Sequence, residues 1–111
     1  LETFGLPLVE SMACGTPVAH PDSCEVMCEV CGEAAYRMPT VRVRAYPEGW
    51  EQQRLTDETV AGAIRYFYML RRERPEQLRQ WQQRAVAWTA RYDWGEAARD
   101  ISRILLRILE D

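Results

Sequence analysis

The sequence predicts an α/β fold in which short strands and helices are followed by three longer helices. Glycines and prolines concentrate before residue 50, and the remainder is rich in Arg, Gln, Glu, Ala and Leu. With 111 residues, the chain has the size of one domain or part of one. Its 47% apolar and 28% charged residues are typical of a globular domain. The few strand-like stretches exclude a complete doubly wound sheet.

The first elements follow from Pro7 and Gly15, which suit the first turn and the end of a helix over residues 7–14. Thr16–Ala19 is a short apolar stretch that predicts a buried strand, and a loop is expected from His20 onward. The apolar positions that recur at helical spacing in the first helix are Leu8, Val9, Met12 and Ala13.

One or two helical turns are expected over Val26–Val30, and a second short strand over Ala34–Tyr36. Residues 37–54 are expected to be irregular, with a strand at Val41–Val43. These elements complete the strand-containing half of the chain.

Three helices are expected in the second half. Thr56 is suited to cap a helix over residues 57–72, and Pro75 begins a second helix that runs to about Ala90. Asp93 is suited to cap a third helix over residues 94–109. Each helix has an apolar face. The residues are Val60, Ile64, Phe67 and Leu70 in the first helix, Leu78, Trp81, Ala85 and Trp88 in the second, and Ala97, Ile101, Ile104, Leu105 and Ile108 in the third.

The segment from Glu2 to Val18 carries the clearest functional pattern. Glu2 precedes a Phe-Gly-Leu-Pro turn and Glu10 lies inside the following helix. Free backbone N–H groups at a helix N-terminus attract a phosphate, whereas carboxylates suit neutral hydroxyls beside it. The alternative is that both acids are ordinary solvated charges.

This segment resembles the nucleotide-sugar-binding motif of retaining GT-B glycosyltransferases of the GT4 type. That motif has two Glu separated by seven residues, then a small-residue helix and Gly-Thr-Pro-Val, and each part is present between Glu2 and Val18. Weaker resemblance continues at Glu29-Val30, Gly32–Ala35, Leu55–Leu70 and Tyr92–Trp94. Departures are Cys28, where the family has Pro, and the long polar stretch over 40–54.

The resemblance implies a partial Rossmann-like fold, the C-terminal portion of a GT-B donor-binding domain, over residues 1–111. It implies that Glu2 contacts the transferred sugar as the catalytic residue and that Glu10 bonds the ribose hydroxyls. It also implies no metal or other cofactor. The donor-binding residues implied are Glu2, Phe4, Gly5, Leu6, Pro7 and Glu10. His20 is a further candidate at the edge of the site. The alternative is that this histidine has an ordinary structural role.

The cysteines form a second pattern, Cys24-x3-Cys28-x2-Cys31, with Cys14 nearby. Three thiolates at this spacing could hold an iron–sulfur cluster or, with His20, a zinc ion. Radical-SAM enzymes hold an iron–sulfur cluster with cysteines at this spacing, but they require a barrel that this chain is too short to form. Free thiols are the alternative, and they indicate a reducing, cytoplasmic location.

The four tryptophans could stack on sugars, but the seven-residue spacing of Trp81 and Trp88 favours packing, and packing is also expected for Trp94.

All 14 basic residues are Arg, and the net charge of −3 argues against a nucleic-acid binder. No apolar run is long enough to span a bilayer. The cluster at Arg71, Arg72 and Arg74 leaves open a peripheral membrane association of the parent protein.

The sequence therefore favours the donor-binding segment of an enzyme that transfers a hexose from a nucleoside-diphosphate sugar to a hydroxyl acceptor, with retention. Because the chain begins at Leu1 rather than Met, we expect it to be part of a longer protein and inactive alone. We also expect it to be marginally stable or to associate through exposed apolar surface. The alternatives are a helical interaction module over residues 57–109 and a cysteine-ligated metal protein.

Overall fold

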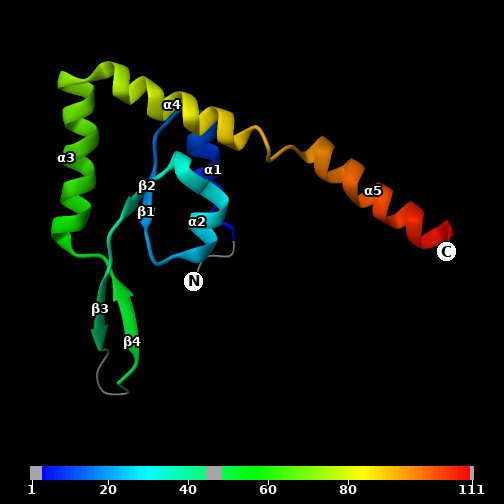
Figure 1. Ribbon diagram of the computed structural model, residues 1–111, viewed down its shortest axis with the longest axis horizontal. Coiled ribbons are helices and arrows are strands. Elements are labelled where there is room, and N and C mark those ends of the chain that lie inside the picture. The colour runs from blue at the N-terminus through cyan, green and yellow to red at the C-terminus, as the bar shows by residue number, and fades with distance from the viewer. Residues whose placement is uncertain (1–3, 45–48, 111) are drawn as a thin grey trace.

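The computed structural model describes residues 4–44 and 49–110 and confirms a mixed α/β chain (Figure 1). Five α-helices, one short 3-10 helix and two small sheets are present in these residues. In chain order they are α1 (Leu6–Ala13), β1 (Ala19–Pro21), α2 (Glu25–Cys31), η1 (Gly32–Ala34), β2 (Tyr36–Met38), β3 (Val41–Arg44), β4 (Glu51–Arg54), α3 (Asp57–Glu73), α4 (Pro75–Thr89) and α5 (Trp94–Glu110).

The first sheet is a parallel pair, β1 and β2, joined through α2 and η1. Ala19 lies opposite Tyr36, and Pro21 lies opposite Met38. A parallel pair requires a crossover connection, and the seven-residue helix α2 followed by η1 supplies it here. The short parallel strands expected from the sequence are therefore present.

Both strands begin later than the sequence predicts. The stretch Thr16–Ala19 was expected to be a strand, but Pro17 has no N–H to donate, and the first ladder bond is from Tyr36 N to the Val18 carbonyl (2.9 Å). The strand expected over Ala34–Tyr36 is delayed because η1 continues the α2 crossover by one tight turn. His20 consequently lies in β1, not in a loop.

Residues 37–54, expected to be largely irregular, contain an antiparallel hairpin of β3 and β4 that extends away from the helices (Figure 1). The strand expected at Val41–Val43 is confirmed as part of β3. Its partner β4 has the sequence Glu-Gln-Gln-Arg and is exposed throughout, so it carries no apolar alternation that a sequence pattern could reveal.

The main core lies where α1, α2, η1 and α4 meet. Met12 and Ala85 are completely buried, which places α1 directly against α4. The buried core residues are Val9, Met12, Val30, Cys31, Ala34, Ala35 and Ala85. Partly buried Leu8, Val18, Val26 and Trp88 pack around them. Of the apolar positions expected for the first helix, Leu8, Val9 and Met12 face this core or its edge, whereas Ala13 is exposed.

A second, aromatic cluster joins α3 and α4 to β2. Tyr36, Tyr66, Phe67 and Trp81 have ring centroids 5.1–6.4 Å apart, and the Trp81 indole donates a hydrogen bond to the Tyr66 hydroxyl (3.2 Å). Such edge and tilted contacts are the favoured aromatic geometries. Packing rather than sugar stacking is therefore the role of Trp81, as expected.

The end of α4 and the turn after it are both hydrogen-bonded to one carbonyl group of α2. The Trp88 indole N–H and the Tyr92 hydroxyl each donate a hydrogen bond of 2.7 Å to the Val30 carbonyl oxygen. Gly32 lies directly against the Trp88 ring and adopts a positive φ of 54°. These contacts fix the turn between α4 and α5 beside the end of α2.

Helix α5 extends away from the rest of the molecule, and each of its residues is exposed (Figure 1). Its first turn is capped as expected, because the Asp93 carboxylate accepts a hydrogen bond from Glu96 N (2.9 Å). The packing expected for Trp94 is wrong, since 89% of this residue is exposed, and no described element covers the start of α5.

Replacing Gly32 by Ala is expected to lower the free energy of unfolding by about 2–4 kcal/mol. The added Cβ would overlap the Trp88 ring, which its hydrogen bond holds in place, and φ is unfavourable for any side chain. Denaturant unfolding followed by circular dichroism measures the change.

Gly62→Ala is the matched control, because a Cβ there meets no atom within 4 Å and the residue lies inside α3. It should raise the free energy of unfolding by about 0.5–1 kcal/mol. Equal effects of the two substitutions would contradict the packing of Gly32 against Trp88.

Candidate functional site

Helix α1 begins at a glycine whose backbone conformation is needed there. Gly5 has φ 82° and ψ 43°, and its carbonyl accepts the N–H groups of Leu8 (3.0 Å) and Val9 (3.3 Å). Pro7 occupies the first turn, where its missing N–H is tolerated. No acidic residue lies in that turn, so the positive end of the helix dipole is not neutralised locally.

A groove of about 780 Å³ runs beside this helix. Its walls are one face of α1, the turn between α4 and α5, and the first two turns of α5. The lining residues are Phe4, Leu6, Val9, Glu10, Ala13, Thr89, Arg91, Tyr92, Asp93, Trp94, Glu96, Ala97 and Asp100. The volume lies in the range of pockets that accept small molecules.

The groove brings together three of the residues that the sequence singled out. Phe4, Leu6 and Glu10 all line it. Gly5 and Pro7 shape the start of α1 without lining the groove, and Gly5 is buried. Glu2, the predicted catalytic residue, lies outside the described residues.

Three aromatic side chains, Phe4, Tyr92 and Trp94, are among the residues that line the groove. The rings of Phe4 and Tyr92 meet edge to face with centroids 5.4 Å apart, and Tyr92 is in turn fixed by its bond to the Val30 carbonyl. Trp94 adds a largely exposed indole to the same wall. The sequence did not single out Tyr92 or Trp94 as site residues, although both belong to the Tyr92–Trp94 segment of the resemblance.

The charged residues that line the groove are mostly acidic, with four carboxylates and one cation among them. Asp100 pairs with Arg103 (2.9 Å), and Glu96 pairs with Arg99. The Arg91 guanidinium stacks on Trp88 with its carbon 3.3 Å from the ring centroid. Within the described part of the chain, Glu10 has neither an ion pair nor a side-chain hydrogen bond, which leaves its carboxylate available to accept bonds from a ligand.

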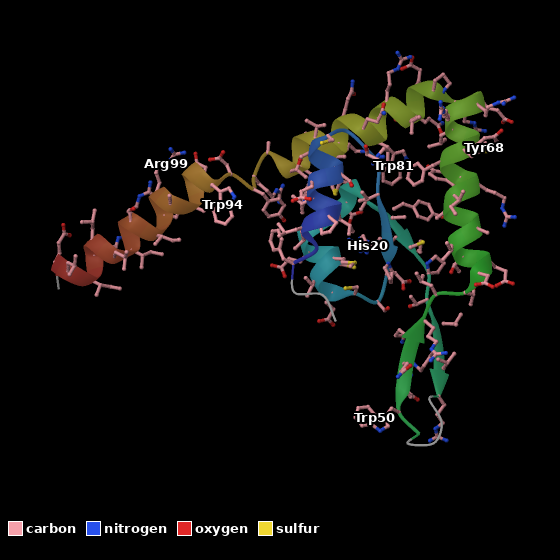
Figure 2. The ribbon with its side chains drawn as sticks, turned by 180° about the vertical axis from the view of Figure 1, so that it is seen from behind. His20, Trp50, Tyr68, Trp81, Trp94 and Arg99 are labelled. Carbon is pink, nitrogen blue, oxygen red and sulfur yellow. The ribbon has the colours of Figure 1, made fainter. Side chains whose placement is uncertain are left out.

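His20 is separate from this groove. It is almost completely buried in β1, and its Nδ1 lies 2.8 Å from the Pro21 carbonyl. Its Nε2 is buried without a hydrogen-bond partner among the described residues. Figure 2 shows the ring in the interior between β1 and the helices, so the structure does not bring His20 to the residues that line the groove.

The cysteines do not assemble into a metal site. In residues 4–44 and 49–110, no group of three or more His, Cys, Asp or Glu side chains is arranged to hold a metal ion. Cys31 is buried in the core, whereas the Cys28 thiol donates a 3.4 Å hydrogen bond to the Asp22 carbonyl. Burial, followed by the neighbouring Cys28 and Cys24, raises the pKa of the Cys31 thiol above its ordinary value.

Comparison with known proteins adds no relative: no family model matches the chain, and no significant match was found among curated proteins or solved structures. Among the helices that the structure describes, none has both the length and the apolar character needed to cross a bilayer. The functional argument therefore depends on the residues and geometry above.

The raised pKa of Cys31 predicts a defined order of thiol reactivity, because the thiolate is the reactive form. With iodoacetamide at neutral pH, exposed Cys14 should be alkylated first and buried Cys31 last, because burial both shields the Cys31 thiol and lowers its thiolate fraction. Peptide mass spectrometry against time measures the rates.

Denatured chain provides the control, since all four thiols should then react at similar rates. Alkylation of Cys31 in the folded chain as fast as that of Cys14 would contradict its burial against α1 and α4.

Proposed function

We propose that this chain is the donor-binding segment of a retaining GT-B glycosyltransferase, which transfers a hexose from a nucleoside-diphosphate sugar to a hydroxyl acceptor. The observation that carries the proposal is that Phe4, Leu6 and Glu10, three residues of the expected donor motif, line one groove of small-molecule size. They lie next to the N-terminus of α1, where a diphosphate would be placed.

In this proposal Glu10 holds the nucleoside. A carboxylate can accept hydrogen bonds from two neighbouring ribose hydroxyls, and such charge-assisted bonds are stronger than neutral ones. The Glu10 side chain is exposed to the groove and has no competing ion pair among the described residues. The acidic lining suits hydroxyl-bearing parts of the donor and repels phosphate.

The diphosphate would then lie at the start of α1, beside Leu6, rather than beside the carboxylates of the groove. The positive φ of Gly5 turns the backbone into the helix, and the first turn carries no acid. These features favour an anion there. Contact of Glu2 with the transferred sugar, and its catalytic role, remain part of the proposal from the motif.

The finer fold assignment is part of the same proposal. α1 precedes a parallel β1–α2–β2 unit, and the β3–β4 hairpin and three helices follow it. Parallel strands joined through a helix are the repeating unit of a Rossmann-like domain. The parallel pair is too small to form a whole sheet, so the proposal requires further strands beside it. No metal cofactor is required, and the reduced thiols favour a cytoplasmic enzyme.

Glu10→Gln is expected to weaken the binding of nucleoside-diphosphate sugars by about 10–150-fold, the cost of one charge-assisted hydrogen bond. The substitution keeps the size of the side chain and removes its charge. Titrations of the 111-residue chain with UDP-, GDP- and ADP-glucose, followed by isothermal calorimetry, identify the preferred nucleotide.

Glu58→Gln is the matched control, because Glu58 is an exposed acid at the start of α3 and does not line the groove. It should leave the affinity unchanged. If the folded chain bound none of the three donors, or if both variants bound as well as the original chain, the donor-binding proposal would be rejected.

The second candidate function is a helical interaction module over residues 57–109. The observation that favours it is the exposed apolar face of α5, which carries Ile101, Ile104, Leu105 and Ile108. A partner for such a face does not exclude donor binding at the groove, because the two surfaces meet only at the start of α5.

A further inference from the structure

One face of α5 is an exposed apolar surface in the described chain. Ile101, Ile104 and Ile108 are each between 58% and 66% exposed. Together with Trp94 and Ala97 they recur with spacings of three and four residues, the seam of a two-helix contact. Most of the stability of a helix in a protein comes from packing of its apolar face, so the exposed seam of this 17-residue helix favours a partner.

The residues beside the seam differ on its two sides. On one side lie Asp100 and Arg107, one heptad apart and opposite in charge. On the other side lie Ala98 and Leu105, both apolar. Asp100 also pairs with Arg103 within its own helix, and Glu96 pairs with Arg99 on the more polar surface of the helix.

We propose that α5 of one chain pairs antiparallel with α5 of a second copy, about a two-fold axis between residues 102 and 103. An isologous contact of this kind uses the same surface on both chains. The occupant of the exposed face is therefore a second copy of this chain.

The size of the side chains supports this register. Ile101 lies opposite Ile104 of the second copy, and Ala97 lies opposite Ile108 of the second copy. A small residue thus faces a large one at each outer layer, which favours close packing. By symmetry each layer occurs twice.

Charge supports the same register. In an antiparallel pair the flanking positions on one side of the seam face their equivalents on the other helix. Asp100 then faces Arg107 of the second copy, and Arg107 faces Asp100 of the second copy. On the opposite side Ala98 and Leu105 face each other, which extends the apolar contact.

A parallel pair would lose both forms of complementarity. Ala97 would face Ala97 of the second copy and leave a gap at that layer. Asp100 would lie beside Leu105 of the second copy, because flanking positions cross the seam in parallel pairs. The antiparallel arrangement is therefore the one that this sequence favours.

The fold leaves space for the second helix. α5 continues outward from α4 and lies well apart from α3 and the hairpin (Figure 1). Figure 2 shows the side chains of α5 projecting into open space on both edges of the ribbon. The C-terminal end of the second α5 would reach Ala97, which also lines the groove, so the pairing would narrow one end of that groove.

Sedimentation equilibrium of the 111-residue chain, over roughly 1 µM to 1 mM, tests the pairing. The original chain is expected to form dimers within this range. Asp100→Arg and Arg107→Asp should each weaken dimerisation by roughly 5–30-fold, because two attractive pairs become repulsive. The double variant should restore the affinity to within about threefold, since exposed pairs of either polarity contribute similarly.

Arg99→Asp is the matched control for Arg107→Asp, because it makes the same change of charge away from the seam and should leave the dimer intact. Circular dichroism of each variant checks the helix content, and rescue by the double variant separates pairing from misfolding. A monomer throughout the range, or dimers that the double variant does not restore, would overturn the proposal. A monomer would assign the face to a different partner.

Discussion

The arrangement of the candidate site depends on one carbonyl oxygen, that of Val30 at the end of α2. It accepts hydrogen bonds from both Trp88 and Tyr92, so it joins the strand-containing half of the chain to the turn after α4. A side chain at residue 32 would displace the Trp88 ring, and the glycine there is what permits the contact. Tyr92, fixed in this way, packs against Phe4, and both rings line the groove beside α1.

The α1 wall and the α5 wall of the groove differ in how firmly they are held. On the α1 side, Met12 and Val9 are buried against α2 and α4, which fixes the direction of Glu10 relative to the core. On the α5 side, the lining residues belong to a helix that begins with a capped turn and then extends away from the rest of the molecule. A ligand bound at Glu10 would therefore contact a rigid wall and a wall whose position depends on what covers α5.

Local sequence signals predicted the helices well because their causes are local. Thr56 caps α3 through a reciprocal bond with Thr59, and prolines mark the first turns of α1 and α4. The strands were less accurate, since their starts depend on the pairing of Val18 with Tyr36 across the α2 crossover. The motif placed Phe4, Leu6 and Glu10 in one site, but Tyr92 and Trp94 join it only through the contact with Val30. Nothing in the sequence alone indicates that contact.

The central claim is that the groove beside Glu10 accepts a nucleoside-diphosphate sugar, and the four indole N–H signals in a ¹⁵N-edited NMR spectrum test it directly. Trp94 lines the groove, whereas Trp50 lies on the hairpin far from it (Figure 2). On addition of the donor, the Trp94 signal should shift in a saturable manner and the Trp50 signal should remain in place. A Trp94 signal unchanged at millimolar donor, or equal shifts at Trp94 and Trp50, would contradict the claim.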